Sequence, residues 1–209
     1  MNGPEFSNPA YRIETKRLLV RCYDPSDAGM LAESVTENVE HLRPWMPWVY
    51  NEPEPIEQKI QRLKRFRGLF DLGQDFVYGI FNPENTKLLG GTGLHTRLGE
   101  RELEIGYWIH KDYINQGLVT ESTSALIRVA FEILHVHRLE IHCNPANFAS
   151  AAVPRKLGFH HEGTLRAKTQ FLDGWSDSMI WGLLEWEYPD SPASKTDIKV
   201  FDADGQQVL

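Results

Sequence analysis

Residues 102–121, ELEIGYWIHKDYINQGLVTE, join the pattern of a β-strand to the start of a helix through one short polar turn. The strand pattern covers residues 102–109. The turn contains one glycine, Gly117, directly before helix-forming residues. The first amides of a helix have no acceptors within it, and the positive end of the helix dipole lies beside them. The sequence therefore predicts an anion site, suited to a phosphate or pyrophosphate, at the amides of residues 116–120.

Regular elements are predicted on both sides of this stretch. Further strands are expected over 17–23, 75–81, 88–97, 138–143, 159–172 and 175–188, and helices over 24–38, 54–72, 116–134 and 147–158. Short polar links between the strands from 75 to 109 predict an antiparallel meander. Asp173 and Gly174 predict the turn of a hairpin. Together these elements predict an α/β (α+β) fold, in which a mixed sheet carries helices on both faces.

The composition is that of a globular protein. The chain has 209 residues, of which 41% are hydrophobic and 24% charged, which suits one domain with a buried core. Its net charge of −7 argues against a nucleic-acid partner and favours cationic ligands such as amines. We expect one domain over 12–188, an N-terminal tail over 1–11 and a loosely held polar tail over 189–209.

Cysteine usage and hydropathy favour a cytoplasmic protein without a membrane partner. Cys22 and Cys143 lie far apart and lack metal-type spacing, which is usual in a reducing compartment. No apolar run approaches about 18 residues. Histidines gather between His135 and His161, but no carboxylate spacing completes a tetrahedral set, so no metal is expected. The basic run over 59–67 is interpreted as a solvated helix face.

Several motifs follow one another along the chain: the strand ELEIGYWI, the loop NQGLVTES, the strand LEIHCNPAN, and KLGF followed by EG. With LRPWMPW near the start and EGTLR after GF, they resemble the GNAT acetyltransferase superfamily, in particular its ribosomal-protein N-terminal acetyltransferase (RimJ/RimL) branch. The resemblance extends over residues 12–188. It implies a GNAT-like, mostly antiparallel sheet that is splayed at a central β-bulge.

The resemblance also implies that the predicted anion is the pyrophosphate of acetyl-CoA. The amides that would hold it belong to Gln116, Gly117, Leu118, Val119 and Thr120. The superfamily pattern for this loop is Gln/Arg-x-x-Gly-x-Gly/Ala. Gly117 fits that pattern, whereas Ile114 and Val119 depart from it. Because backbone amides do most of the phosphate holding, we expect binding to survive both departures.

On the same resemblance, the β-bulge lies at Gly106 and Tyr107, in the GYWI segment, and separates this strand from the strand over 138–143. The pantetheine of acetyl-CoA would pair with backbone at Trp108, Ile109 and His110, and a freed amide would stabilise the thioester oxygen. Asn147 would order the pantetheine, although an asparagine there also suits a helix cap. A simple strand kink at Gly106 is the alternative to the bulge.

Two residues are candidates for acid–base chemistry. Glu104 alternates with Gly106 and Trp108 on one strand face, so it could take the amine proton, directly or through water. On the resemblance, Ser150 or solvent would protonate the thiolate, because Pro154 stands where many superfamily members have a tyrosine. Pro154 should also kink its helix and remove the partner of the Ser150 carbonyl. The alternatives are an exposed carboxylate at Glu104 and a helix-capping role for Ser150.

The aromatic residues Trp45, Trp48 and Tyr50 either line an acceptor pocket or pack against the core. The leading hypothesis is an N-acetyltransferase that moves an acetyl group from acetyl-CoA to a protein or peptide N-terminal α-amine. A small-molecule amine acetyltransferase and a non-catalytic acyl-CoA-binding module are the alternatives. The expected partner is thus a peptide N-terminus or a small amine, with a homodimer possible.

Overall fold

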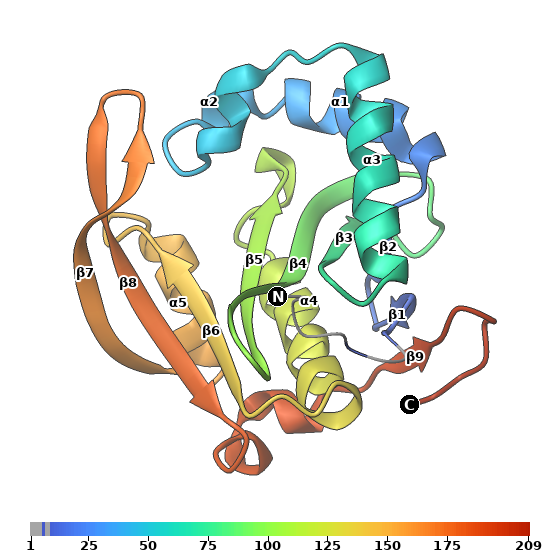
Figure 1. Cartoon of the computed structure of the whole chain (residues 1–209), viewed down its shortest axis with the longest axis vertical. Helices are drawn as coiled ribbons and strands as arrows, with labels where there is room; N and C mark the ends of the chain where they lie inside the picture. The colour runs from blue at the N-terminus through green and yellow to red at the C-terminus, as the bar shows by residue number, and fades with distance from the viewer. Residues whose placement is uncertain (1–5, 7–8) are drawn as a thin grey trace.

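The protein is seen here as a computed structural model that describes residue 6 and residues 9–209, and it forms one sheet of nine strands in the order β7-β8-β6-β5-β4-β3-β2-β1-β9 (Figure 1). The strands are β1 Arg12–Glu14, β2 Leu19–Cys22, β3 Phe76–Phe81, β4 Leu88–Gly99, β5 Glu102–Ile109, β6 Arg138–Cys143, β7 His160–Phe171, β8 Gly174–Leu184 and β9 Lys199–Phe201. The α-helices are α1 Ala28–Thr36, α2 Val39–Leu42, α3 Ile56–Asp71, α4 Leu118–Arg128 and α5 Phe148–Lys156. Short helical turns are η1 Pro25–Asp27, η2 Pro47–Asn51, η3 Lys111–Tyr113, η4 Val129–Ile133, η5 Tyr188–Asp190 and η6 Pro192–Lys195. Among these strands the β5–β6 pair is parallel and the other neighbours are antiparallel, so the predicted mixed, mostly antiparallel sheet is confirmed.

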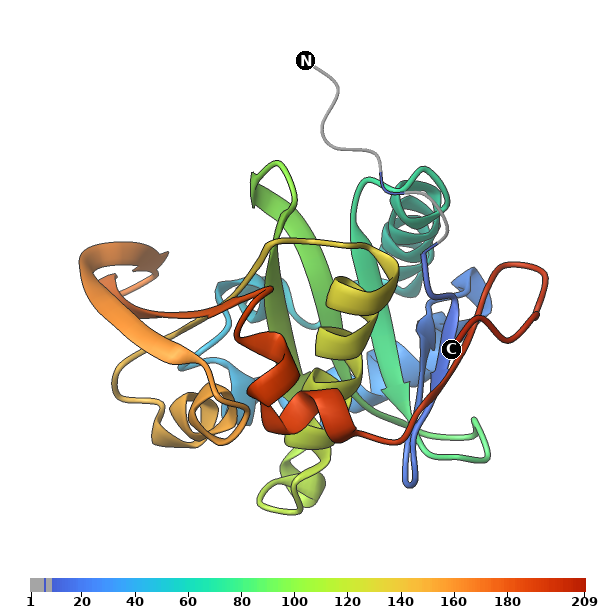
Figure 2. The same ribbon diagram turned by 90° about the horizontal axis from the view of Figure 1, so that it is seen from below.

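Helices cover both faces of the sheet, as predicted. Successive side chains of a strand point to opposite faces. On β5, Leu103 and Ile105 are buried in the main core cluster together with Leu126 of α4. The other face of β5 carries Glu104 and Trp108, and Trp108 packs against the second cluster, which α1 and α3 cover. Figure 2 shows α4 lying along one side of the sheet, so each face of β5 meets a different set of helices.

Strands β5 and β6 separate beyond the pair formed by Glu104 and Glu140. Their parallel pairing covers three positions and ends at Glu104 and Glu140, after which β5 remains paired with β4 and β6 with β8 (Figure 1). We call the unpaired part, residues 105–109 facing residues 141–143, the splay. Each half of the sheet keeps its own twist, and the two strands diverge where no ladder joins them.

The prediction of a β-bulge at Gly106 and Tyr107 is wrong. The β4–β5 register runs regularly through both residues and shifts between His95 and Gly99 instead. The Thr92 hydroxyl donates to the Gly106 carbonyl over 2.9 Å, which helps hold β5 against β4 at this point. The splay therefore results from the end of β5–β6 pairing and needs no extra residue in β5.

The C-terminal segment over 189–209 is not loosely held, contrary to expectation. Strand β9 pairs with β1, and Ala193, Ile198 and Val200 are buried in the main core. Arg128 of α4 donates to the Thr196 carbonyl over 2.8 Å. These three buried apolar side chains hold the segment against the core, although most of its residues are polar. Of the predicted tail over 1–11, residues 1–5 and 7–8 lie outside the described part of the chain, and Ala10 is buried.

The expectation of a solvated basic face on α3 is wrong for Lys59. Its side chain is 1% exposed, and its ammonium lies 2.6 and 2.7 Å from the two carboxylate oxygens of Glu52, which is equally buried. A buried charge requires such a partner. The ion pair fixes the segment between η2 and α3 to the helix.

Candidate active site

The loop before α4 has the geometry of an anion site. Gly117 caps α4 with φ of +76°, in the left-handed region that glycine adopts without strain. The first amide bonded within the helix is that of Glu121, which donates to the Gly117 carbonyl over 3.0 Å. The amides of residues 118–120 precede that bond, so they are available at the positive end of the helix dipole. Of the amides predicted to hold the anion, those of Leu118, Val119 and Thr120 are thus the ones that the start of α4 leaves without a helical acceptor.

The two departures from the superfamily pattern have simple structural consequences. Val119 is half-buried and packs against the main core cluster. Its side chain therefore occupies the protein interior and leaves the amides of the loop accessible. Ile114 is 42% exposed at the start of the loop.

Arg17 contacts this loop, which the sequence did not reveal. Its guanidinium donates to the Gln116 carbonyl over 2.9 Å and to the Glu121 carboxylate over 2.7 Å. Thr15 also donates to Glu121, over 2.6 Å. Burial raises the pKa of Glu121, but the hydrogen bonds from Thr15 and Arg17 together bring it below its ordinary value. Arg17 lies about a hundred residues from the loop in sequence, so only the fold places its positive charge there.

The backbone N–H and C=O groups of successive β5 residues point alternately toward β4 and toward the splay. The His110 amide donates to the Leu89 carbonyl of β4 over 2.8 Å. In an antiparallel ladder, residues two apart have the same orientation, so the backbone groups of Trp108 also face β4. Those of Tyr107 and Ile109 face the splay. Of the three residues expected along the pantetheine, Ile109 is therefore suitably oriented, whereas the amides of Trp108 and His110 are already directed to β4.

Asn147, Ser150 and Tyr107 form a polar group on the α5 side of the splay. Asn147 caps α5 by accepting from the Ser150 amide over 3.0 Å, as its capping interpretation predicted. The Tyr107 hydroxyl donates to the Ser150 carbonyl over 3.0 Å, and the Ser150 hydroxyl donates to Tyr107 over 3.2 Å. Helix α5 continues past Pro154 to Lys156. Tyr107 was not predicted as a site residue, although the carbonyl left without a donor by Pro154 indicated that some partner was needed.

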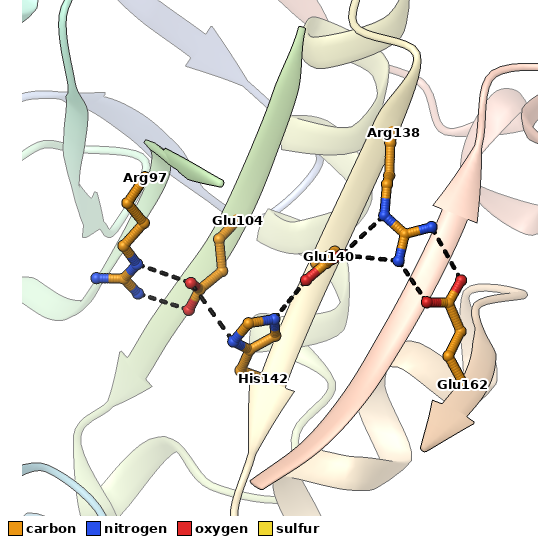
Figure 3. Close-up of polar contacts among 6 residues, drawn as sticks. All are labelled: Arg97, Glu104, Arg138, Glu140, His142 and Glu162. Carbon is orange, nitrogen blue, oxygen red and sulfur yellow. Dashed lines mark hydrogen bonds and ion pairs between the residues drawn. The ribbon is translucent and has the colours of Figure 1, made fainter. Parts of the chain in front are cut away.

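Glu104 lies at the last position of β5 that pairs with β6 (Figure 3). Strand alternation places it on the face opposite Tyr107. Its side chain is 9% exposed, and both of its oxygens accept from the Arg97 guanidinium, over 2.7 and 2.5 Å. The hydrogen bond to Glu104 raises the pKa of Arg97 further. The carboxylate is thus buried and paired, which rules out the interpretation of Glu104 as a freely exposed strand residue.

A chain of charged side chains extends from Glu104 across the sheet, through residues of β6 to β7 (Figure 3). The Nδ1 atom of His142 lies 3.6 Å from Glu104 Oε2, and its Nε2 atom lies 2.5 Å from Glu140 Oε2. Arg138 then joins Glu140, over 2.7 Å, to Glu162. We call these residues, from Arg97 to Glu162, the charged chain. The sequence placed only Glu104 among the candidates.

The aromatic residues Trp45, Trp48 and Tyr50 were expected either to line an acceptor pocket or to pack against the core. Trp48 packs edge-on against Trp108, with 6.2 Å between ring centroids, and both are partly buried against the second core cluster. Core packing is thus established for Trp48. Trp45 and Tyr50 are half-buried beside it, and nothing in the structure tests whether they contact an acceptor.

Among residue 6 and residues 9–209, no three side chains of His, Cys, Asp or Glu group as a metal site would require. Over the same residues, no helix combines the length and apolar character needed to cross a membrane.

Comparisons with known proteins identify the family. A family model described as acetyltransferase (GNAT) domain matches residues 17–160. The chain is 29% identical over 186 residues to the ribosomal protein uS5-alanine N-acetyltransferase of Escherichia coli strain K12, covering 88% of this chain and 95% of that protein. A structure of the ribosomal-protein α-N-acetyltransferase RimL with coenzyme A superposes with a TM-score of 0.75 at 22% identity, covering 81% of this chain and 95% of RimL. The microcin self-immunity acetyltransferase MccE, solved with acetyl-CoA and AMP, gives a TM-score of 0.75 at 19% identity, covering 81% of this chain and 93% of MccE. Since the family model spans well over half of the chain, the protein belongs to the GNAT acetyltransferase family.

Proposed function

We propose that this acetyltransferase moves the acetyl group of acetyl-CoA directly to the α-amine at the N-terminus of a protein or peptide. The relatives support this substrate class, since the Escherichia coli protein is named for acetylating an alanine of a ribosomal protein. The observation that carries the proposal is the position of the splay. The splay opens beside β5, the strand that leads to the anion loop before α4. At the splay, β5 carries Glu104 on one face and Tyr107 on the other.

The residues at the splay fit acetyl-CoA. The amides of residues 118–120 and the nearby Arg17 guanidinium would hold the pyrophosphate. The free backbone groups of Tyr107 and Ile109 would pair with the amides of the pantetheine, as an added strand would. Asn147 would lie beside the pantetheine while it caps α5. When bound, acetyl-CoA supplies an activated acetyl thioester.

Glu104 and Ser150 are the proposed catalytic residues. Glu104 would face the incoming amine on the side of the sheet covered by α1 and α3. Its carboxylate would hold the ammonium form and assist its deprotonation. Ser150, on the other side, would turn its hydroxyl from Tyr107 and donate a proton to the leaving sulfur. Tyr107, 3.2 Å away, would then turn from the Ser150 carbonyl and donate its own proton to that hydroxyl. Acid and base on opposite faces of β5 suit a transfer that occurs within the splay.

The acceptor region would be completed by η2 and the residues before it, in which the half-buried Trp45 and Tyr50 are the candidates. Trp48 would support it from beneath through Trp108. A ribosomal-protein acceptor would place the activity in the cytoplasm, and both cysteines, Cys22 and Cys143, are free thiols, as that compartment favours. A homodimer remains a proposal that sedimentation equilibrium would test.

The proposal is tested by release of coenzyme A from acetyl-CoA in the presence of defined amines. Peptides with a free N-terminus and no lysine should be acetylated at the α-amine, which mass spectrometry locates. A panel of small amines provides the comparison for the alternative acceptor class. Turnover of small amines with no turnover of any free-terminus peptide would replace the peptide acceptor by a small-molecule one.

A further inference from the structure

We propose that His142 receives the proton that the acceptor amine loses, with Glu140 positioning its imidazole ring. The inference rests on the proposed function, because it concerns the same transfer, but it assigns the proton to a residue outside the candidates considered so far. His142 lies on β6 two residues beyond Glu140, where β6 is no longer paired with β5. It therefore stands at the edge of the splay, next to Glu104.

The contacts of the ring determine which nitrogen can accept a proton. Glu140 is a carboxylate that accepts hydrogen bonds, so the His142 Nε2 atom, 2.5 Å away, carries the hydrogen in the neutral ring. The Nδ1 atom then holds a lone pair. It faces Glu104 Oε2 at 3.6 Å, a distance too long for a hydrogen bond between them. These two acceptors lie close enough that one ammonium group beside them can donate a hydrogen bond to each.

The charges of the chain support the same conclusion. Arg97 and Arg138 contribute two positive charges, and Glu104, Glu140 and Glu162 contribute three negative ones. With a neutral His142, the net charge of the charged chain is therefore −1. One further positive charge would neutralise the chain, either on the acceptor ammonium or, after proton transfer, on His142. The proton thus moves between two positions that leave the total charge unchanged.

Acetylation removes two protons from the ammonium nitrogen. One N–H bond breaks and an Nδ1–H bond forms on His142, and the electron pair left on the nitrogen forms the new C–N bond to the acetyl carbon. The nitrogen releases its second proton to solvent as the C–S bond breaks, which leaves the neutral amide. The thiolate takes a proton from the Ser150 hydroxyl, Tyr107 replaces that proton, and Tyr107 regains its own from solvent, so the products are the amide, the thiol of coenzyme A and a protonated His142.

The other groups in the chain are poorer final acceptors. Protonating Glu104 would disrupt two hydrogen bonds from Arg97, and protonating Glu140 would disrupt one from Arg138. A second histidine, His95, faces the same side of the sheet from β4. Its Nδ1 atom is 2.9 Å from Asp75, and the register pairs it with Glu104. His95 is therefore the rival that the experiment must exclude.

The far end of the chain is arranged to hold Glu140 in place. Arg138 reaches Glu162 of β7 by passing over Gly182 of β8. A Cβ atom at Gly182 would lie 2.3 Å from the Glu162 carboxylate and 3.1 Å from the Arg138 guanidinium. The absence of a side chain at this position leaves space for the Arg138–Glu162 pair. Glu140, Arg138 and Glu162 are thus positioning residues, which act through His142.

The test compares the pH dependence of kcat/KM for the full chain and the variants His142→Gln, Glu140→Gln and His95→Gln, with acetyl-CoA and the acceptor that the wild-type protein uses. His142→Gln should lower the rate about 100-fold near neutral pH, within the range of general acid–base catalysis. The loss should shrink at alkaline pH, where the amine is already neutral. Glu140→Gln should displace the acidic limb of the profile with a smaller loss of rate. His95→Gln should keep the wild-type profile.

The rise in melting temperature with acetyl-CoA shows whether each variant is folded and binds the co-substrate, and it should match the wild type. A wild-type profile for His142→Gln, or loss of the acidic limb in His95→Gln alone, would overturn the assignment. Should His142→Gln fail to fold, His142→Asn provides a second neutral side chain of similar polarity. A wild-type protein that turns over no amine at all would instead refute the proposed function, and the assignment with it.

Discussion

The Tyr107 hydroxyl donates to the backbone carbonyl of Ser150, over 3.0 Å, and thereby joins β5 to α5 across the splay. In an uninterrupted helix that carbonyl would accept from the amide of residue 154, but Pro154 has none. The same tyrosine accepts from the Ser150 hydroxyl over 3.2 Å. Tyr107 thus supplies the donor that Pro154 lacks, and it forms a pair with Ser150 beside the expected position of the leaving thiol.

Tyr107→Phe and Ser150→Ala should separate stability from catalysis. Tyr107→Phe leaves the Ser150 carbonyl without a donor and should reduce the free energy of unfolding by about 1–3 kcal/mol. Ser150→Ala keeps that hydrogen bond and should lower kcat by about 10- to 1000-fold, with a smaller effect on acetyl-CoA affinity. Urea unfolding and steady-state kinetics give both quantities. An unchanged kcat in Ser150→Ala would transfer the acid role to solvent or to another residue.

Acetyl-CoA should stabilise the fold through the loop at Gly117. At about 100 times its dissociation constant, a ligand adds about 2.7 kcal/mol to the free energy of unfolding. Gly117→Glu should abolish the rise in melting temperature, because it adds a carboxylate to the phosphate site and a side chain at a positive φ. Gly68→Glu on the exposed surface of α3 is the matched control and should keep the rise. An equal rise in both variants would exclude the loop as the phosphate site.

The buried Lys59–Glu52 pair should dominate the stability of the α3 region. Lys59→Met leaves the Glu52 carboxylate buried without its partner, and we expect a loss of about 3–5 kcal/mol in the free energy of unfolding. The double variant Lys59→Met/Glu52→Gln should recover much of that loss, since no unpaired charge remains. Denaturant titration measures all three proteins. A single variant within about 0.5 kcal/mol of the wild type would contradict the burial of this pair.

Glu140 should link stability to acidic pH. The hydrogen bond with His142, and then that with Arg138, holds the pKa of Glu140 below its ordinary value of 4.5. A carboxylate whose pKa is depressed by folding contributes stability above its unfolded pKa and loses it as the pH falls through the folded value. Below pH 4.5 the free energy of unfolding should therefore fall less steeply in Glu140→Gln than in the wild type. Parallel slopes in the two proteins would remove Glu140 as a source of acid lability.

The fold was largely predictable because strand β5 and the turn at Gly117 have local signatures. Alternation in the sequence placed Glu104 and Trp108 on one face of β5, and the structure buries Leu103 and Ile105 in the core on the other face. The location of the splay depends on where β5–β6 pairing ends, which is a property of two strands far apart in sequence. For this reason the sequence wrongly predicted that a bulge at Gly106 and Tyr107 causes the splay.

The charged chain and the C-terminal strand escaped prediction for related reasons. Arg97 and His142 meet Glu104 through strand register, which no local motif encodes. The buried Val200 and Ile198 are few among polar neighbours, so average composition concealed their anchoring role. Arg17 likewise reaches its loop through the tertiary fold alone.

The central claim, acetyl transfer to an N-terminal α-amine, is tested most directly by comparing two peptides at pH 7. An α-amine has a pKa of about 7.7–8.0 and a lysine ε-amine one of about 10.4, so about one in ten of the former is neutral and about one in 2500 of the latter. One peptide has a free N-terminus and no lysine, and the other has a blocked N-terminus and one internal lysine. Coenzyme A release, with mass spectrometry of the product, gives kcat/KM for each. The account predicts clear preference for the free-terminus peptide, whereas equal or faster acetylation of the blocked lysine peptide would contradict it.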